Sequence, residues 1–155
     1  MDKPSFDAIF LDLAVKIAQR SHCIKKRVGA VLAKDTRVIS TGYNGPPSNA
    51  LHCDEVWPTQ GCPRDARGSC SLALHAEQNA ILYALRQQTL IRDSTLYATL
   101  SPCLPCARII LSVGITRVVY VSSYAHYKQL SNDEGISFLK RFGVSVEQQA
   151  STTPF

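Results

Sequence analysis

The sequence predicts one α/β domain in three layers, with helices on both faces of a central mixed sheet of five strands. An early pattern of two β-rich runs around a turn predicts an antiparallel hairpin. After residue 75, helical and strand-like segments alternate, and a helix between two strands normally makes a right-handed parallel crossover. The length of 155 residues suits one core. We therefore expect a single domain over residues 1–150 and a loose tail over 151–155.

The first half of the chain predicts a helix, the hairpin and a long connection. Residues 6–20 carry apolar positions at helical spacing after Ser5, a residue that favours the start of a helix. The two β-rich runs follow on either side of a KDT turn at 34–36. Residues 43–73 are rich in Pro, Gly and Ser and lack periodicity. A compact domain rarely carries so long a loop unless something holds it together.

The second half of the chain alternates helices with strands. Helical spacing predicts helices over residues 75–88, from Pro102 to about Gly114, and over 131–143. Strand patterns lie between and after them, over residues 94–100, 117–123 and 144–148. Ser131 and Glu134 have the spacing of a capping box at the start of the last helix. These crossovers, combined with the hairpin, make the predicted sheet mixed.

Composition and charge narrow the class of protein. Hydrophobic residues make up 45% of the chain and charged residues 19%, which is typical of a globular domain. No apolar run is long enough to cross a membrane, and the stretch MDKPSFDAIF lacks the features of a secretory signal. We therefore expect a cytoplasmic protein without a membrane partner. The formal net charge of +5 suits phosphate-bearing ligands but is too modest to identify one.

His75 and Glu77 stand two positions apart at the start of an apolar helix. Residues two apart lie about 200° apart around a helix axis, so they cannot share a face. They converge only on an object beyond the N-terminal end, where the helix dipole favours anions. Taken alone, however, a histidine there is usually a cap, and a first-turn glutamate is common.

Cys103 and Cys106 lie in the run SPCLPCARII and share a face at the start of the next helix. A C-x-x-C pair alone fits a redox pair or half of a structural zinc site. Together with His75, the two sulfurs make three zinc ligands and leave the fourth tetrahedral position open, as in catalytic zinc sites. The pattern His-x-Glu, followed after residues 78–101 by Pro-Cys-x-x-Cys, is the signature of zinc deaminases, with Glu77 as the acid–base group.

The chain resembles the deoxycytidylate deaminase family, within the zinc-dependent cytidine deaminase superfamily. The similarity covers most of residues 10–125 and rests on TGYNG, LHAEQNAI and DSTLYATLSPCLPCA. Asn49 departs from the family, whose P-x-G run often has glycine there. The resemblance implies a cytidine-deaminase-like fold and hydrolytic deamination of dCMP to dUMP and ammonia, in pyrimidine deoxynucleotide metabolism. It also implies a homo-oligomer, often a hexamer, with dCTP and dTTP as candidate effectors.

The same resemblance assigns substrate contacts to three residues. Asn44 in TGYNG matches the family's asparagine near the sugar and base. The backbone N–H of Ala76 meets the base oxygen O2, and the backbone near Ser101 accepts from the leaving amine. A turn residue tolerant of unusual φ is the alternative interpretation of Asn44.

The substrate phosphate requires cations or N–H groups. The candidates are Lys25 and Arg27, in the basic run before the first strand, and Lys128. Tyr124 is a candidate for stacking on the nucleotide. A solvated, charged helix end explains the basic run at 25–27 equally well.

The four remaining cysteines predict a second, structural zinc site. Cys53, Cys62 and Cys70 all fall in the long connection that needs to be held together, and Cys23 precedes the hairpin. Without a secretory signal, disulfides are not expected. The positions of these four cysteines resemble those of cysteines in some bacterial-type relatives. His52 is an alternative ligand, and each cysteine alone fits a small buried hydrophobe.

Three other functions stay open. A deaminase of bases in RNA or single-stranded DNA would need a basic, aromatic groove, but basic residues outside the run at 25–27 are scattered, which argues against a nucleic-acid partner. A free nucleoside or base fits the same chemistry. A non-catalytic, zinc-stabilised binding module is disfavoured by Glu77, because a structural zinc does not need that carboxylate.

Overall fold

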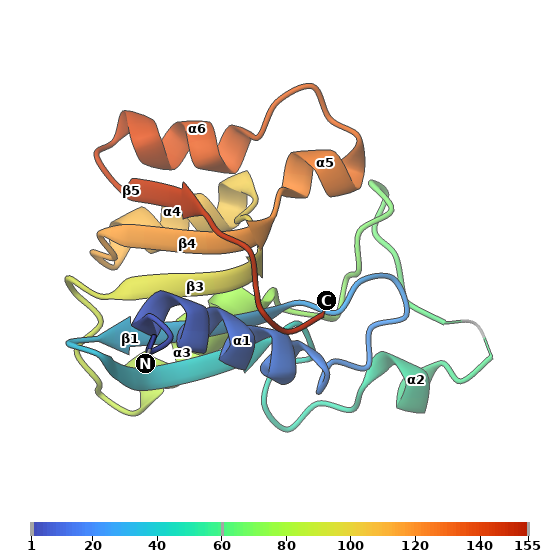
Figure 1. The fold of residues 1–155 in the computed structure, drawn as a ribbon. Helices are drawn as coiled ribbons and strands as arrows, with labels where there is room; N and C mark the ends of the chain where they lie inside the picture. The colour runs from blue at the N-terminus through green and yellow to red at the C-terminus, as the bar shows by residue number, and fades with distance from the viewer. Residues whose placement is uncertain (1, 60, 155) are drawn as a thin grey trace.

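A computed structural model describes residues 2–59 and 61–154 (Figure 1). The strands are β1 (Gly29–Lys34), β2 (Arg37–Tyr43), β3 (Thr95–Leu100), β4 (Arg117–Ser122) and β5 (Ser145–Gln148). The helices are α1 (Phe6–Ala18), α2 (Cys53–Val56), α3 (Ala76–Arg86), α4 (Leu104–Ser112), α5 (Tyr124–Lys128) and α6 (Glu134–Arg141). None of these helices has the length and apolarity needed to traverse a lipid bilayer.

The strands form one sheet in the order β2-β1-β3-β4-β5. β1 pairs antiparallel with both β2 and β3, whereas β3, β4 and β5 run parallel. Asp35 and Thr36 turn the β1–β2 hairpin with φ of 49° and 62°, and positive φ at both central positions matches the twist of the strands. The predicted mixed sheet of five strands is confirmed.

Helices cover both faces of the sheet, as predicted (Figure 1). Alternate side chains of β1 point to opposite faces, because successive residues of a strand alternate. Val31 and Ala33 join the core under α1, which lies on the near face in Figure 1. Ala30 and Leu32 join the core under α3 and α4 on the other face. The two cores fix the three layers, and α6 packs against α4 and β5.

The first turn of α3 is held directly against β2. A Cβ added to Gly42 would lie 2.3 Å from the carbonyl oxygen of Ala76 and 2.5 Å from the amide nitrogen of Ala80. Only glycine leaves room for the helix backbone to approach so closely. Gly42 therefore sets the position of the helix start that carries His75 and Glu77.

Helix boundaries differ from the predictions at the C-terminal end. α6 is capped by Asp133, whose carboxylate accepts from the amide of Ile136 at 3.2 Å, so the prediction of a Ser131 cap is wrong. The short helices α2 and α5 lack the length for a periodic pattern and were not predicted.

Residues 151–153 are anchored to α1, whereas the sequence predicts a loose tail over 151–155, whose last residue lies outside the described part of the chain. Asp12 of α1 accepts from the hydroxyl of Ser151 at 2.8 Å and from the amide of Thr152 at 2.9 Å. It also accepts from the amide of Thr153 at 3.1 Å. Figure 1 shows this segment crossing in front of the sheet after β5. The sequence did not predict this anchoring, because the residues of the segment are polar and their partner, Asp12, lies far away in the chain.

Candidate metal and catalytic site

Two helices begin at the same edge of the sheet, each with a candidate ligand at its cap. His75 is the N-cap of α3, and its amide donates to the side-chain oxygen of Gln78 at 2.9 Å, as in a capping box. Cys103 is the N-cap of α4, with Pro105 in the first turn. Because proline favours the first helical turn, the sequence PCLPC starts a helix just after β3. The first turns of α3 and α4 therefore face each other.

The three predicted ligand atoms converge. The Nδ1 of His75 lies 3.3 Å from the Sγ of Cys103 and 3.3 Å from the Sγ of Cys106. Zinc bonds of about 2.3 Å to sulfur and 2.0 Å to nitrogen in a tetrahedron place these atoms about 3.5 Å apart. A hydrogen bond with Cys106 lowers the pKa of the Cys103 thiol to about 4, and a hydrogen bond with His75 adds to this. The donor set thus fits a zinc ion in spacing and in the type of its ligand atoms, two sulfurs and one imidazole nitrogen.

Glu77 lies beside these ligands with only 4% of its surface exposed. Burial raises the pKa of Glu77 to about 7, against the lowering effect of the charge on His75. A carboxyl with such a pKa holds or releases a proton easily at neutral pH. The position suits an acid–base group that is not itself a ligand.

His75, Glu77 and Cys103 line a cavity of about 160 Å³. Of the residues singled out in the sequence, it is lined by Cys23, Lys25, Asn44, Cys70, His75, Ala76, Glu77, Ser101, Cys103, Tyr124 and Lys128. Ala76 is the first residue of α3, where backbone N–H groups lack a partner within the helix. Such an N–H can donate to a base bound in the cavity.

Asn44 bridges the chain at the rim of this cavity. Its side-chain oxygen accepts from the amide of Val28 at 2.8 Å, and its side-chain nitrogen donates to the carbonyl of Lys26 at 2.9 Å. The backbone carbonyl of Asn44 accepts from the hydroxyl of Ser21. These contacts hold the segment before β1 against the cavity, so Asn44 has a positioning function in addition to any contact with substrate.

Aromatic and basic side chains face each other at the mouth of the cavity. Lys128 lies 6.0 Å from the ring centre of Tyr124 and 5.2 Å from that of Tyr127. Lys26, on the opposite segment, lies 5.8 Å from the ring of Tyr127. Lys25 donates to the carbonyl of Gly68 at 2.8 Å. This group offers positive charge near the predicted position of a substrate phosphate.

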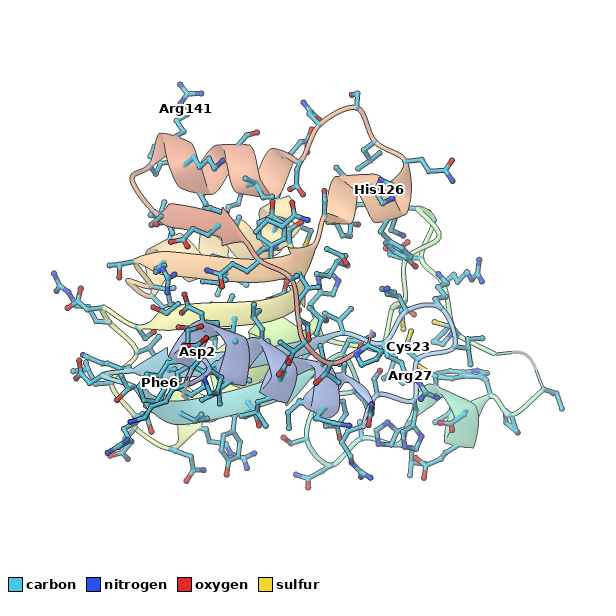
Figure 2. All side chains as sticks on the ribbon, viewed as in Figure 1. Asp2, Phe6, Cys23, Arg27, His126 and Arg141 are labelled. Atoms are coloured by element: carbon cyan, nitrogen blue, oxygen red, sulfur yellow. The ribbon has the colours of Figure 1, made fainter. Side chains whose placement is uncertain are left out.

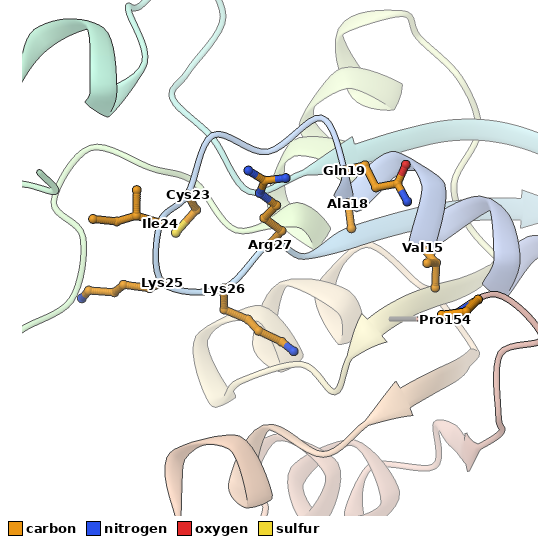
Figure 3. A pocket seen from close by; sticks show the side chains of 9 residues that line it. All are labelled: Val15, Ala18, Gln19, Cys23, Ile24, Lys25, Lys26, Arg27 and Pro154. Atoms are coloured by element: carbon orange, nitrogen blue, oxygen red, sulfur yellow. The ribbon is translucent and has the colours of Figure 1, made fainter. Parts of the chain in front are cut away.

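Arg27, unlike Lys25 and Lys26, does not line this cavity. It lines a neighbouring cavity of about 430 Å³, to which the two lysines also contribute (Figure 3). In that view its side chain extends away from that of Lys26, which precedes it. Alternation along an extended segment sends adjacent side chains to opposite sides. Of the predicted phosphate contacts, Lys25 and Lys128 line the candidate site and Arg27 does not.

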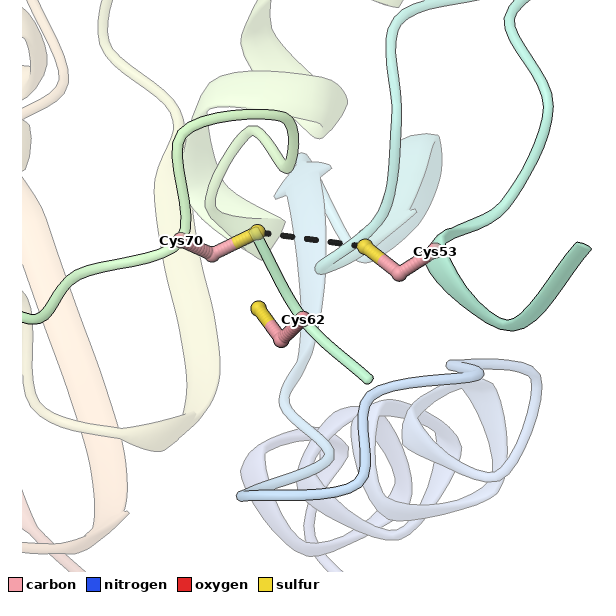
Figure 4. A group of neighbouring side chains, drawn as sticks. All are labelled: Cys53, Cys62 and Cys70. Atoms are coloured by element: carbon pink, nitrogen blue, oxygen red, sulfur yellow. Dashed lines mark hydrogen bonds between the residues drawn. The ribbon is translucent and has the colours of Figure 1, made fainter. Parts of the chain in front are cut away.

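A second group of sulfurs gathers in the long connection. Cys53, Cys62 and Cys70 place their Sγ atoms within 4.8 Å of one another (Figure 4). The Sγ atoms of Cys53 and Cys70 are 3.9 Å apart, close to the separation of about 3.8 Å between two thiolates on one zinc. Three separate segments of the irregular connection thus meet at one point.

Cys23 and His52 are the two candidates for a fourth ligand of this group. Both line the same cavity as the three clustered cysteines, and Figure 2 shows Cys23 in the loop that follows α1. The ring of His52 stacks on that of His22 with centres 3.9 Å apart. The Nδ1 of His22 also lies 3.0 Å from the carboxylate of Asp54. These contacts tie the loop that carries Cys23 to α2.

Sequence reasoning missed two residues at the site. Tyr127 lines the cavity but was not singled out, whereas Lys26, which also lines it, belongs to the basic run predicted at 25–27. Asp133 accepts at 2.6 Å from the hydroxyl of Ser101, a residue at the end of β3. The one available signal was that an aspartate directly before Glu134 is itself a good helix cap.

Comparisons with known proteins identify the family. Residues 4–122 match the family model described as the cytidine and deoxycytidylate deaminase zinc-binding region. The deoxycytidylate deaminase of Mycobacterium phage D29 is 41% identical over 77% of this chain and 97% of its own length. That of Saccharomyces cerevisiae is 41% identical over 97% of this chain, which spans only 46% of the yeast protein.

Similarity of fold agrees with similarity of sequence. The crystal structure of the dCMP deaminase from the cyanophage S-TIM5, in complex with dCMP and dUMP, has a TM-score of 0.77 and 30% identity to this chain. The match covers 96% of this chain and 100% of that one. This chain therefore belongs to the zinc-binding family of cytidine and deoxycytidylate deaminases.

Proposed function

We propose that this chain is a zinc-dependent enzyme that deaminates dCMP hydrolytically to dUMP and ammonia. The observation that carries the proposal is the buried carboxyl of Glu77 beside three converging metal ligands, at the wall of a cavity. A purely structural zinc site does not need such a carboxyl. The similarity to the phage D29 deoxycytidylate deaminase over nearly its whole length supports dCMP as the substrate.

His75, Cys103 and Cys106 would hold the zinc ion. Three protein ligands leave one tetrahedral position for another molecule, which distinguishes a catalytic from a structural zinc. When bound, the ion supplies hydroxide near neutral pH, since zinc lowers the pKa of water from 15.7 to about 7. The side chains and backbone of the protein transfer the protons and orient the base and the phosphate.

Glu77 moves the protons. Its carboxylate takes a proton from water and, as the acid, delivers it to ring N3 of the base, which prepares C4 for attack. It then takes the second proton of that water, from the oxygen now bonded to C4, and gives it to the amine nitrogen. The C4–N bond breaks, ammonia leaves, and the oxygen stays on C4 as a carbonyl. The pKa of about 7 suits both directions of transfer.

Backbone groups at the two helix starts orient the base. The N–H of Ala76, at the first position of α3, donates to the base O2. The backbone carbonyl of Ser101, at the end of β3, accepts from the amine at C4. A carbonyl acceptor favours an amine over the carbonyl of the product, which helps the product to leave.

The phosphate would be met at the mouth of the cavity. A nucleoside monophosphate carries nearly two negative charges, which require cations or N–H donors. Lys25, Lys26 and Lys128 line the cavity there, and Tyr124 is placed to stack on the nucleotide. Arg27 is left out of the proposed phosphate site, because it does not line this cavity.

We expect dCMP to be preferred over deoxycytidine by at least about tenfold in kcat/KM, which requires only about 1.4 kcal/mol from a charge-assisted contact. Ammonia release from cytosine, deoxycytidine, dCMP, dCTP and short single-stranded DNA or RNA measures this preference. Because the lysines are near solvent, raising the salt concentration should reduce the preference.

Equal rates on dCMP and deoxycytidine at low salt would contradict the phosphate site and favour a nucleoside substrate. Activity on the single strands alone would favour a nucleic-acid deaminase. Release from none of them by the zinc-loaded protein would leave the non-catalytic binding module as the better explanation.

We also propose a structural zinc at the second sulfur group. Cys53, Cys62 and Cys70 supply three thiolates, and Cys23 is the proposed fourth ligand, with His52 as the alternative. The spacing of the sulfurs supports this, and so does the length of the connection, which has few regular hydrogen bonds to hold it. A metal that ties three points of a loop offsets the chain entropy that would otherwise unfold it.

Three further expectations stay predictions from the sequence. One is a homo-oligomer, often a hexamer in this family. Another is regulation by dCTP and dTTP. The third is a cytoplasmic location, in deoxynucleotide metabolism.

A further inference from the structure

The carboxylate of Asp133 joins two segments that border the active site. One oxygen accepts from the hydroxyl of Ser101 at 2.6 Å and from the hydroxyl of Ser123 at 3.1 Å. The other oxygen caps α6 through the amide of Ile136. Ser101 directly follows β3, just before the ligand-bearing segment, and is 1% exposed, while Ser123 caps α5. Asp133 itself is not among the residues that line the cavity.

The two serine hydroxyls also contact the start of α5, and the direction of their hydrogens determines which hydrogen bonds they make there. The oxygen of Ser101 accepts from the amide of Tyr124 at 2.6 Å, and that of Ser123 accepts from the amide of His126 at 3.3 Å. A hydroxyl has one hydrogen to donate, and Asp133 receives it in both cases. The lone pairs of both oxygens are thereby left to face the first turn of α5. Asp133 thus orients the two serine hydroxyls that bind the backbone of α5.

α6 also approaches the ligand-bearing segment directly. A Cβ on Gly135 would lie 1.9 Å from the carbonyl oxygen of Pro102 and 3.0 Å from the carbonyl carbon of Cys103. The start of α6 is therefore in backbone contact with the segment that carries a zinc ligand. Asp133 sits at this junction, between that segment and α5.

We propose that Asp133 is a positioning residue, which holds α5 so that Tyr124 and Lys128 border the substrate. α5 supplies three residues to the cavity wall, Tyr124, Tyr127 and Lys128. Its five residues are too few for a helix to be stable by itself. The two serine hydroxyls at its start accept from the amides of Tyr124 and His126, alongside the packing of Tyr124 against the core. The inference rests on the proposed function, in which α5 meets the sugar phosphate of dCMP.

The variant Asp133→Asn tests this inference with little change in shape. Asparagine is also a good helix cap, so α6 should be retained. Its NH₂ group, however, replaces an acceptor with a donor that opposes both serine hydroxyls. We expect KM for dCMP to rise about tenfold or more with kcat lowered less than about threefold, as for a loss of binding alone. The zinc content should be unchanged, and the preference for dCMP over deoxycytidine should fall.

Asp7→Asn is the matched control. Asp7 accepts from the hydroxyl of Tyr97 at 2.7 Å and pairs with Arg117, joining α1 to β3 and β4 outside the cavity. This variant should lower the melting temperature while leaving KM for dCMP unchanged. Ser123→Ala removes one of the two hydroxyls that Asp133 holds. Combined with Asp133→Asn it should raise KM by less than the product of the single effects, because both act through one contact.

Amide hydrogen exchange over residues 123–129 tests the placement of α5 without any substrate. We expect faster exchange there in Asp133→Asn and none of this change in Asp7→Asn. Unchanged exchange over 123–129, or a rise in KM that Asp7→Asn shares, would overturn the inference. Failure of the proposed function is distinct from this: the unaltered protein would then not prefer dCMP, whatever the exchange data show.

Discussion

The zinc-loaded variant Glu77→Ala should deaminate dCMP several orders of magnitude more slowly than the unaltered protein. Glu77 is the only carboxyl that lines the described cavity, and in our account it carries every proton of the reaction. General acid–base catalysis typically contributes 10² to 10⁴-fold, and a thousandfold corresponds to about 4 kcal/mol of activation free energy. Steady-state ammonia release at saturating dCMP measures the effect.

The zinc content and the melting temperature of Glu77→Ala should stay close to those of the unaltered protein, since Glu77 is not a ligand in this account. Glu134→Gln is a matched control. Glu134 is also a first-turn glutamate, so this variant removes a similar interaction with a helix dipole but no acid–base group. A near-normal rate for Glu77→Ala would show that its assigned role is wrong.

Cys62→Ser should lose one of two zinc ions per chain, together with much of the stability of the long connection. Structural zinc sites in small peptides contribute about 10–16 kcal/mol of apparent binding free energy, most of it coupled to folding. Elemental analysis of gently purified protein gives the number of ions, and limited proteolysis reports whether residues 43–73 have unfolded. The separate variants Cys23→Ser and His52→Ala show which residue is the fourth ligand.

A stable protein with a single zinc, unchanged by Cys62→Ser, would contradict the structural site. Cys53, Cys62 and Cys70 would then be packing residues that happen to meet. Loss of both ions with Cys62→Ser would also contradict two independent sites.

The convergence of the candidate ligands and Glu77 could be predicted because their spacing is local. His75 and Glu77 fall within one helix turn, and Cys103 and Cys106 within another, so each pair has the geometry that helix rules give it. Short sequence patterns likewise predict the turn at Asp35, from two β-rich runs on either side of it, and the parallel crossovers, from a helix between two strands. The sheet brings the two helix starts together, and its central strands β1 and β3 are buried on both faces and appear in the sequence as short apolar runs.

The remaining features depend on contacts between distant segments. Asp133 meets Ser101 across 32 positions, and Ser151 meets Asp12 across 139, so no local pattern announces either. Arg27 was grouped with Lys25 by charge, but Arg27 lines only the neighbouring cavity, whereas Lys25 lines both cavities. Capping chemistry alone could not choose Asp133 over Ser131, because both residue types favour that position.

The central claim is that water replaces the C4 amine, and an oxygen-18 experiment tests it most directly. The zinc-loaded full chain is incubated with dCMP in ¹⁸O-labelled water, and the nucleotide and ammonia are quantified by mass spectrometry and enzymatic assay. The account predicts equal amounts of ammonia and dUMP, with the label in the C4 oxygen of dUMP. No ammonia from dCMP, or a dUMP product without the label, would contradict it.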